Sequence, residues 1–213
     1  MALENVTPTA EHRNIWFKKP ILRIIYGDYY QRILNDCVRG SVIEIGSGTG
    51  NFKEYFPPAI SCDIQVVDWI DVALDAHRLP FKENSIDNIV MVDTLHHLQA
   101  PVRFFEEVAR VLKIGGRLIM VEPQISLLSY LAYKFFHPEP VHMSYNPFID
   151  RPIDSVRDPF DSNQAIPHLL MTKYHSELEA RFTNLKLIKY QSFSPFSYLL
   201  SGGFRKWSLI PMA

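Results

Sequence analysis

The chain of 213 residues has room for one domain with an insertion, and it buries enough surface to fold without disulfides or a structural metal. Its residues are 47% hydrophobic and 21% charged, which excludes general disorder. Lys and Arg number 22 against 23 Asp and Glu, and this net charge of −1 disfavours a nucleic acid as the main partner.

Two cysteines, Cys37 and Cys62, are too few for a disulfide framework or a four-cysteine zinc site, so we expect free buried thiols. Residues 1–19 have no apolar core of the signal-peptide type. The longest apolar stretch, Ile125 to Phe136, is too short to span a bilayer. We therefore expect a cytoplasmic protein with no transmembrane segment.

The predicted elements alternate in type along the first half of the chain. Apolar side chains at helical spacing predict a helix over 20–38, which Gly40 ends. Strands follow over 41–45, 59–63, 71–75 and 86–92, with a short helix over 51–56. A helix over 101–112 ends at Gly115 and Gly116, before a strand over 117–122. This rhythm predicts an α/β fold with a Rossmann-like, mostly parallel sheet and helices on both faces.

A glycine-rich segment, Glu44-Ile45-Gly46-Ser47-Gly48-Thr49-Gly50, joins the first predicted strand to the short helix. Glycine lets a backbone approach a ligand closely, because no Cβ stands in the way. The spacing G-x-G-x-G departs from the dinucleotide fingerprint G-x-G-x-x-G, since Asn51 stands where the third glycine belongs. Glu44 would also serve a phosphate poorly, so a nicotinamide-dependent oxidoreductase is disfavoured.

The chain from about Val42 to Pro123 resembles the class I S-adenosylmethionine-dependent methyltransferases, in particular the methyltransferase type 11 group. The glycine segment carries this resemblance together with acids at the ends of the second and third strands and four further motifs in the family's order. These are Asp63, Asp75-Ala76, Leu79-Pro80-Phe81, Ser85-Ile86-Asp87, Asp93-Thr94-Leu95-His96-His97-Leu98 and Lys113-Ile114-Gly115-Gly116. Ile86 and Ile114 replace the family's usual Phe and Pro.

The resemblance implies S-adenosylmethionine as cofactor, with Asp63 on the ribose hydroxyls and Asp75 on the adenine amino group. Asp68 is the alternative ribose acid, but residues 60–63 have the pattern of a strand end, which favours Asp63. The acids also suit a cationic sulfonium, although Glu44 has a second interpretation in orienting the glycine loop. The predicted cofactor-binding residues are Glu44, Gly46, Ser47, Gly48, Asp63, Ile64, Asp75, Ala76, His77, Asp93 and Thr94.

Composition changes after Pro123. Prolines and aromatic residues gather over 138–167, which favours an ordered insertion or lid over a linker. For the apolar run Ile125 to Phe136, core packing is favoured over a pocket wall or a membrane contact. A helix over 171–182 and a strand over 185–190 follow. We predict a single domain with an N-terminal helical segment (1–39), a cofactor-binding core (40–123), the insertion (124–171) and a C-terminal helix and strand (172–213).

The predicted function is methyl transfer to a small, fairly apolar acceptor. The alternative is a non-catalytic module that binds a protein partner. The acceptor pocket should lie over the ends of the fourth and fifth strands, below a roof from 123–167 that includes Tyr130, Tyr133, Phe136, Tyr145 and Phe148.

Catalytic residues stay unassigned, with His97 as the best-placed general base if the acceptor needs one. No metal site is predicted, because it would need three convergent ligands and no H-x-x-x-H or His/Cys cluster appears. His96 and His97 are adjacent, so on a helix or strand they should point apart. The oligomeric state is left open. The family's sheet has seven strands. For the last of them the chain offers only Phe204 to Ile210, and otherwise that edge of the sheet stays open.

Overall fold

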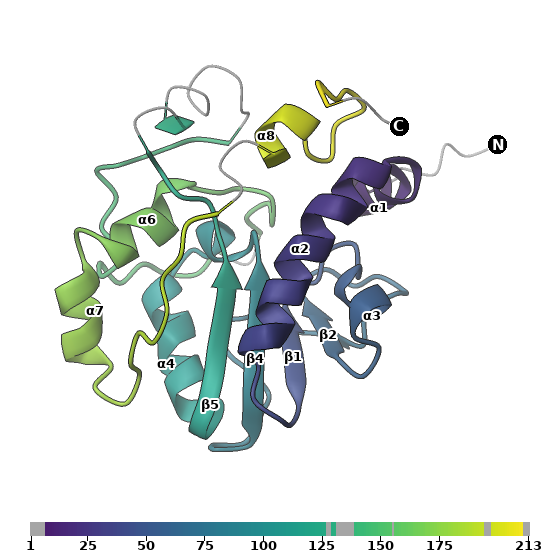
Figure 1. Ribbon diagram of the computed structural model, residues 1–213. Coiled ribbons are helices and arrows are strands. Elements are labelled where there is room, and N and C mark those ends of the chain that lie inside the picture. The colour runs from purple at the N-terminus through teal and green to yellow at the C-terminus, as the bar shows by residue number, and fades with distance from the viewer. Residues whose placement is uncertain (1–6, 127–128, 131–138, 155, 194–196, 211–213) are drawn as a thin grey trace.

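The computed structural model describes residues 7–126, 129–130, 139–154, 156–193 and 197–210. Five strands form one sheet in the order β3-β2-β1-β4-β5, and every neighbouring pair is parallel. The strands are β1 (Val42–Ile45), β2 (Ile60–Asp63), β3 (Val72–Ala73), β4 (Ile86–Val92) and β5 (Leu112–Val121). The predicted α/β fold is confirmed. Because the strand order reverses between β1 and β4, their carboxyl ends form the switch point where open sheets bind ligands (Figure 1).

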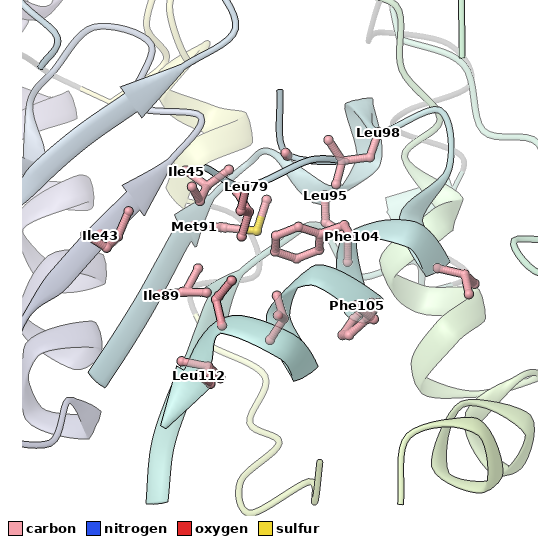
Figure 2. Close-up of a cluster of buried hydrophobic side chains, with 14 of the residues drawn as sticks. Ile43, Ile45, Leu79, Ile89, Met91, Leu95, Leu98, Phe104, Phe105 and Leu112 are labelled. Atoms are coloured by element: carbon pink, nitrogen blue, oxygen red, sulfur yellow. The ribbon is translucent and has the colours of Figure 1, made fainter. Parts of the chain in front are cut away.

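Helices cover both faces of this sheet, as predicted. They are α1 (Pro8–Lys18), α2 (Pro20–Asp36), α3 (Phe52–Tyr55), the 3-10 helix η1 (Leu95–His97), α4 (Pro101–Val111), α6 (Ala165–Met171), α7 (His175–Arg181) and α8 (Ser197–Ser201). Val42 and Val90 belong to the buried cluster that contains α2. Their strand neighbours Ile43, Ile89 and Met91 belong to the opposite cluster, and Figure 2 shows Ile89 and Met91 on the side of Phe104 and Phe105 of α4. Alternate residues of a strand point to opposite faces of the sheet, so β1 and β4 each contribute apolar side chains to both buried clusters.

Lys19 joins α1 and α2 to the C-terminal segment. It is almost fully buried, and its ammonium donates to the carbonyl oxygens of Gly203, Arg205 and Trp207 at 2.7, 2.8 and 2.9 Å. Three carbonyls match the three donors of an ammonium group. Burial still lowers the pKa of Lys19. The residue therefore fixes where residues 203–207 lie, although they are remote from it in sequence.

Several predicted elements differ from the structure. Gly115 and Gly116 lie within β5 rather than before it, at a register shift opposite Ile86 and Asn88. The helix predicted over 171–182 is interrupted after α6 and resumes as α7. No strand forms over 185–190, where Lys189 instead pairs with Asp36 of α2 at 2.6 Å.

Of the two alternatives for the seventh strand, its formation over Phe204 to Ile210 is wrong, because this segment forms turns and bends. Two of this segment's carbonyl oxygens, those of Arg205 and Trp207, accept hydrogen bonds from Lys19 rather than from a neighbouring strand. The division into four segments stays a prediction. In the described part of the chain, no helix is long and apolar enough to cross a membrane.

Candidate functional site

The loop after β1 carries three glycines with positive φ, Gly46, Gly48 and Gly50, and the first two have different surroundings. At Gly46 (φ +73°), a Cβ would lie 2.3 Å from the side chain of Thr94, so the loop approaches the end of β4 too closely for any side chain. At Gly48 (φ +48°), a Cβ would meet no atom within 4 Å. The loop therefore presents bare backbone to open space at Gly48, which suits close approach by a ligand.

Asp63, at the end of β2, holds this loop in place. Its Oδ2 accepts a hydrogen bond from the Gly48 amide at 2.8 Å, and its Oδ1 accepts one from the Gln65 amide at 2.9 Å. Ser47 adds a second connection, because its amide donates to the Cys62 carbonyl at 3.0 Å and its Oγ accepts from the Cys62 amide at 2.9 Å. Asp63 thus organises the loop in addition to any contact with a ligand. Ile64 follows it and is 58% exposed.

Helix α1 covers the same loop, which the sequence did not predict. The guanidinium of Arg13 donates to the Thr49 carbonyl and lies 4.8 Å from the centre of the Trp69 ring. The indole of Trp69 donates to the Gly48 carbonyl at 2.9 Å. Arg13 lies in the predicted N-terminal helical segment (1–39) and Trp69 lies between two predicted strands, and no motif singled out either residue.

Asp75, two residues after β3, presents a carboxylate that is 39% exposed. Its Oδ1 accepts hydrogen bonds from the amide of His77 at 2.8 Å and from the Nδ1 of His77 at 2.6 Å. The Nε2 of His77 accepts from the Ala100 amide at 3.2 Å, which places the ring proton on Nδ1. His77 therefore orients Asp75, while Ala76 between them is buried.

Glu44 is buried near the centre of the sheet, and its Oε2 has no hydrogen-bond partner among the described residues. Burial raises the pKa of Glu44 to about 8. Its carboxyl group is therefore largely protonated at neutral pH. Titratable groups whose pKa is strongly shifted by burial gather at functional sites, which makes Glu44 a candidate site residue.

Asp93 follows β4 with a positive φ of +49°, a conformation that costs a non-glycine residue energy. Its Oδ2 accepts a hydrogen bond from the hydroxyl of Tyr26 at 2.9 Å, and burial raises its pKa to about 6. The hydroxyl of Thr94 donates to the Val92 carbonyl at 2.9 Å. The chain thus turns sharply at the carboxyl end of β4, which is where the predicted site lies.

Glu122, which the sequence analysis did not select, fixes the turn after Asp93. Its Oε1 accepts hydrogen bonds from the amides of Thr94 at 2.9 Å and Leu95 at 2.6 Å. Its Oε2 accepts from the Nδ1 of His96 at 2.8 Å. Its position directly after β5, at the same edge of the sheet as Asp63 and Asp93, could have identified Glu122 from the sequence as a site residue.

The prediction that His96 and His97 point apart is wrong, because both lie in the tight 3-10 turn η1 and their ring centres are 4.3 Å apart. Burial lowers the pKa of His96, but hydrogen bonds to Glu122 and Glu139 outweigh it and raise the pKa to about 10. Burial and the neighbouring charge of His96 lower the pKa of His97 to about 4. One ring is therefore cationic at neutral pH and the other is neutral.

A cavity of about 1000 Å³ lies beside this turn, between α1, the predicted insertion and the C-terminal segment. Glu139 lines it and lies 3.4 Å (Oε2) from the Nε2 of His96. Tyr198 also lines it, and its ring centre is 6.1 Å from that of Tyr26, the partner of Asp93. Its other walls include His12, Pro140, Arg157, Phe160, Phe204, Trp207 and Leu209. The cavity therefore borders the end of β4.

The predicted roof of this cavity is only partly correct. Phe160 comes from the predicted segment, but Phe148 lies against Tyr174, with ring centres 6.0 Å apart, and packs on the core beside α4. Tyr145 also packs there and donates to the Gln99 carbonyl at 3.1 Å. Tyr130 lies in a short helical turn, and Tyr133 and Phe136 are outside the described residues. The C-terminal segment supplies the remaining aromatic walls, and the sequence did not predict this.

Comparison with known proteins finds relatives of the segment that carries the glycine loop. Residues 43–120 match the family model described as a methyltransferase domain. The chain is 29% identical over 119 residues to an uncharacterized protein of Methanocaldococcus jannaschii, a match covering 52% of this chain and 57% of that protein. It is 28% identical over 139 residues to a probable S-adenosylmethionine-dependent methyltransferase of Mycobacterium tuberculosis, covering 56% of this chain and 47% of that protein.

A demethylmenaquinone methyltransferase of Paenarthrobacter aurescens is 31% identical over 113 residues, with 44% of each chain covered. The chain spans about half the length of the curated relatives it matches. The matched segment contains β1 to β4 and most of β5, and so includes the glycine loop and the acids that hold it. Through this segment the chain is similar to S-adenosylmethionine-dependent methyltransferases.

Proposed function

We propose that this protein transfers a methyl group from S-adenosylmethionine to a small, largely apolar acceptor held in the cavity beside η1. The observation that carries the proposal is the position of that cavity. Its walls include Glu139, which contacts His96, and Tyr198, which packs on the partner of Asp93. The cavity and the glycine loop thus meet at the carboxyl end of β4. When bound, the cofactor supplies a methyl group already activated on a cationic sulfur.

The residues present fit this cofactor. Gly48 offers backbone with open space before it, and Asp75 offers a partly exposed carboxylate that can accept from an amino group. Asp63 uses both oxygens on backbone amides, yet a carboxylate has about four acceptor positions and can also accept from a hydroxyl. Glu44 lies in β1, directly before this loop, and its buried Oε2 has no hydrogen-bond partner among the described residues. These groups are the ones proposed to hold the cofactor.

The cavity favours an apolar acceptor of modest size. Its volume of about 1000 Å³ is at the upper end of the range for small-molecule pockets, and Phe160, Phe204 and Trp207 contribute aromatic surface. One relative is named for demethylmenaquinone, and this supports a small-molecule acceptor. The main tasks of the protein are to align acceptor and cofactor and to exclude water, and such positioning contributes ~7–11 kcal/mol in well-oriented reactions.

The alternative function, a non-catalytic module that binds a protein partner, predicts cofactor binding without turnover. Isothermal calorimetry with S-adenosylmethionine and S-adenosylhomocysteine tests the cofactor. Transfer of labelled methyl to a panel of hydroxylated and aminated apolar aromatics tests the reaction. Binding of both cofactor forms with transfer to at least one acceptor supports the enzyme. Failure of both cofactor forms to bind contradicts the proposal.

Replacing Gly48 with valine is expected to reduce S-adenosylmethionine affinity by about 100-fold or more, because the new side chain fills the space where the cofactor approaches the backbone. Gly115→Val is a matched control, since Gly115 also has positive φ (+81°) and open space around its Cβ position. It lies near the start of β5, away from the carboxyl edge. The two variants should lose similar stability, and only Gly48→Val should lose affinity. Equal affinities in the two folded variants would place the cofactor elsewhere.

Shortening Phe160 to alanine is expected to raise the KM for the acceptor about tenfold and to leave cofactor affinity unchanged, because this ring lines the cavity and not the glycine loop. Steady-state kinetics with the best acceptor from the panel measures the effect. Phe148→Leu is the control, because Phe148 packs beside Tyr174 instead. A KM that rises for Phe148→Leu and not for Phe160→Ala would place the acceptor beside Phe148 and Tyr174 rather than in the cavity.

A further inference from the structure

Three side chains that bind metals well converge at the edge of the cavity. His96 and His97 come from η1, and Glu139 comes from the segment predicted to cover the sheet. Each offers one ligand atom, and the three atoms all lie within 4.8 Å of one another. Two imidazoles and one carboxylate form a ligand set that divalent transition metals use at sites with open coordination positions.

The second ring nitrogen of each histidine is already engaged. The Nδ1 of His96 donates to a carboxylate oxygen of Glu122 at 2.8 Å. The Nδ1 of His97 is 3.3 Å from the carbonyl oxygen of Asp161, and because a carbonyl only accepts, this nitrogen carries the proton. In His97 the lone pair for a metal is then on Nε2, and His96 offers its Nε2 lone pair once a metal ion displaces the second proton of that ring. A histidine that ligates a metal almost always donates its other nitrogen to a carboxylate or a carbonyl in this way.

The carboxylate is oriented as well. The Oε2 of Glu139 accepts hydrogen bonds from Ser162 Oγ at 3.1 Å and from the side-chain amide of Gln164. It lies 3.4 Å from the Nε2 of His96. Two ligand atoms that are each ~2.1 Å from a tetrahedral metal lie ~3.4 Å apart, so this pair has the required separation. The ligand atom of His97 lies within 4.8 Å of the other two, and binding requires it to approach them to a similar separation.

We propose that His96, His97 and Glu139 bind one divalent transition-metal ion of the zinc type at the wall of the cavity. Because Glu139 lines the cavity, an open coordination position would face it. An oxygen of the acceptor can occupy that position, and this role, unlike the site itself, rests on the proposed methyl transfer. The competing account of the cluster is a protonated His96 held between the carboxylates of Glu122 and Glu139, with no metal involved.

The test is a titration of the untagged full chain with Zn²⁺ in competition with a chromophoric chelator, after removal of metal and without cofactor. The expected result is one equivalent bound per chain. His97→Gln and Glu139→Gln should each lower Zn²⁺ affinity by at least about 100-fold, because loss of an outer-shell partner alone costs ~10–100-fold. His142→Gln is the matched control, since His142 is exposed in the same segment, outside the cluster. It should bind as the parent does.

A second measurement keeps the test decisive if a variant fails to fold. Co²⁺ bound to the parent should give the intense visible absorption of a tetrahedral nitrogen and oxygen site, and Glu139→Asp should shift it. Two results would overturn the site: a parent protein that binds almost no Zn²⁺, or equal Zn²⁺ affinity in the parent and the folded variants. Either result would favour a protonated His96 held between Glu122 and Glu139. Since no cofactor is present, either outcome is independent of the proposed methyl transfer.

Discussion

Asp63→Asn is expected to weaken S-adenosylmethionine binding by about 10–100-fold, whereas Asp68→Asn should leave the affinity unchanged. The carboxylate of Asp63 accepts from the amides of Gly48 and Gln65 at 2.8 and 2.9 Å, and asparagine retains only one acceptor oxygen. A charge-assisted hydrogen bond is worth ~1.5–3 kcal/mol, and each 1.4 kcal/mol is about a tenfold change in affinity. Asp68 is exposed, which makes it a matched control of equal charge.

The same pair of variants separates two roles for Asp63. If the residue organises the loop, hydrogen exchange at the Gly48 amide should accelerate in Asp63→Asn before any cofactor is added. If it only contacts the cofactor, exchange should match the parent and only calorimetry should change. Unchanged affinity and unchanged exchange in a folded Asp63→Asn would refute both roles, and weaker binding by Asp68→Asn would restore the alternative ribose acid.

The parts of the fold that the sequence predicted well are those with strong local patterns. The β-branched run that forms β1, the apolar run of β4 and the stripe of α4 lie where expected, because each has a clear period and a clear end. The glycine loop could also be predicted, since its glycines lie between a predicted strand and a predicted helix. The carboxyl edge of the sheet could therefore be assigned before its geometry was known.

The parts that the sequence did not predict depend on contacts between distant residues. Lys19 is one example, because its three carbonyl partners are in residues 203–207 and no local pattern links them. The strand predicted over 185–190 is another, since its apolar residues suit a strand but its chain packs along α2 through Lys189 and Phe193. The residue types of these segments favour ordered structure, but strand propensity does not reveal which part of the fold a segment packs against.

The candidate site shows the same division. Asp63, Asp75 and Asp93 were selected because each follows a strand at the ligand-binding edge, and the structure places all three there. Glu122 satisfies the same rule after β5 and was overlooked. Glu139 follows no such rule, because it reaches His96 from the segment predicted to be a lid. The convergence of His96 with His97 was mispredicted because helix and strand geometry were assumed for a 3-10 turn.

Glu44→Gln is expected to stabilise the protein at high pH by roughly 3–5 kcal/mol relative to the parent, and to change stability little near pH 5. Burial raises the pKa of Glu44 from an ordinary 4.5 to about 8, so between these values the folded state holds a proton that the unfolded state has released. The contribution of Glu44 to stability therefore falls as pH rises from about 4.5 to 8. Glutamine has nearly the same shape as glutamate but does not ionise, so the variant should not show this loss of stability as pH rises.

Urea unfolding of parent and variant at pH 5, 7 and 9, without cofactor, measures the effect as a growing difference in the free energy of unfolding. Other titrating groups are common to both proteins and cancel in that difference. Glu83→Gln, at an exposed position before β4, is the control for loss of one negative charge and should show a much smaller change with pH. A difference for Glu44→Gln that stays constant from pH 5 to 9 would mean that Glu44 is not buried in its neutral form. The expected result, combined with weaker cofactor binding by the variant, would show that this acid is retained beside the glycine loop for binding and at a cost in stability.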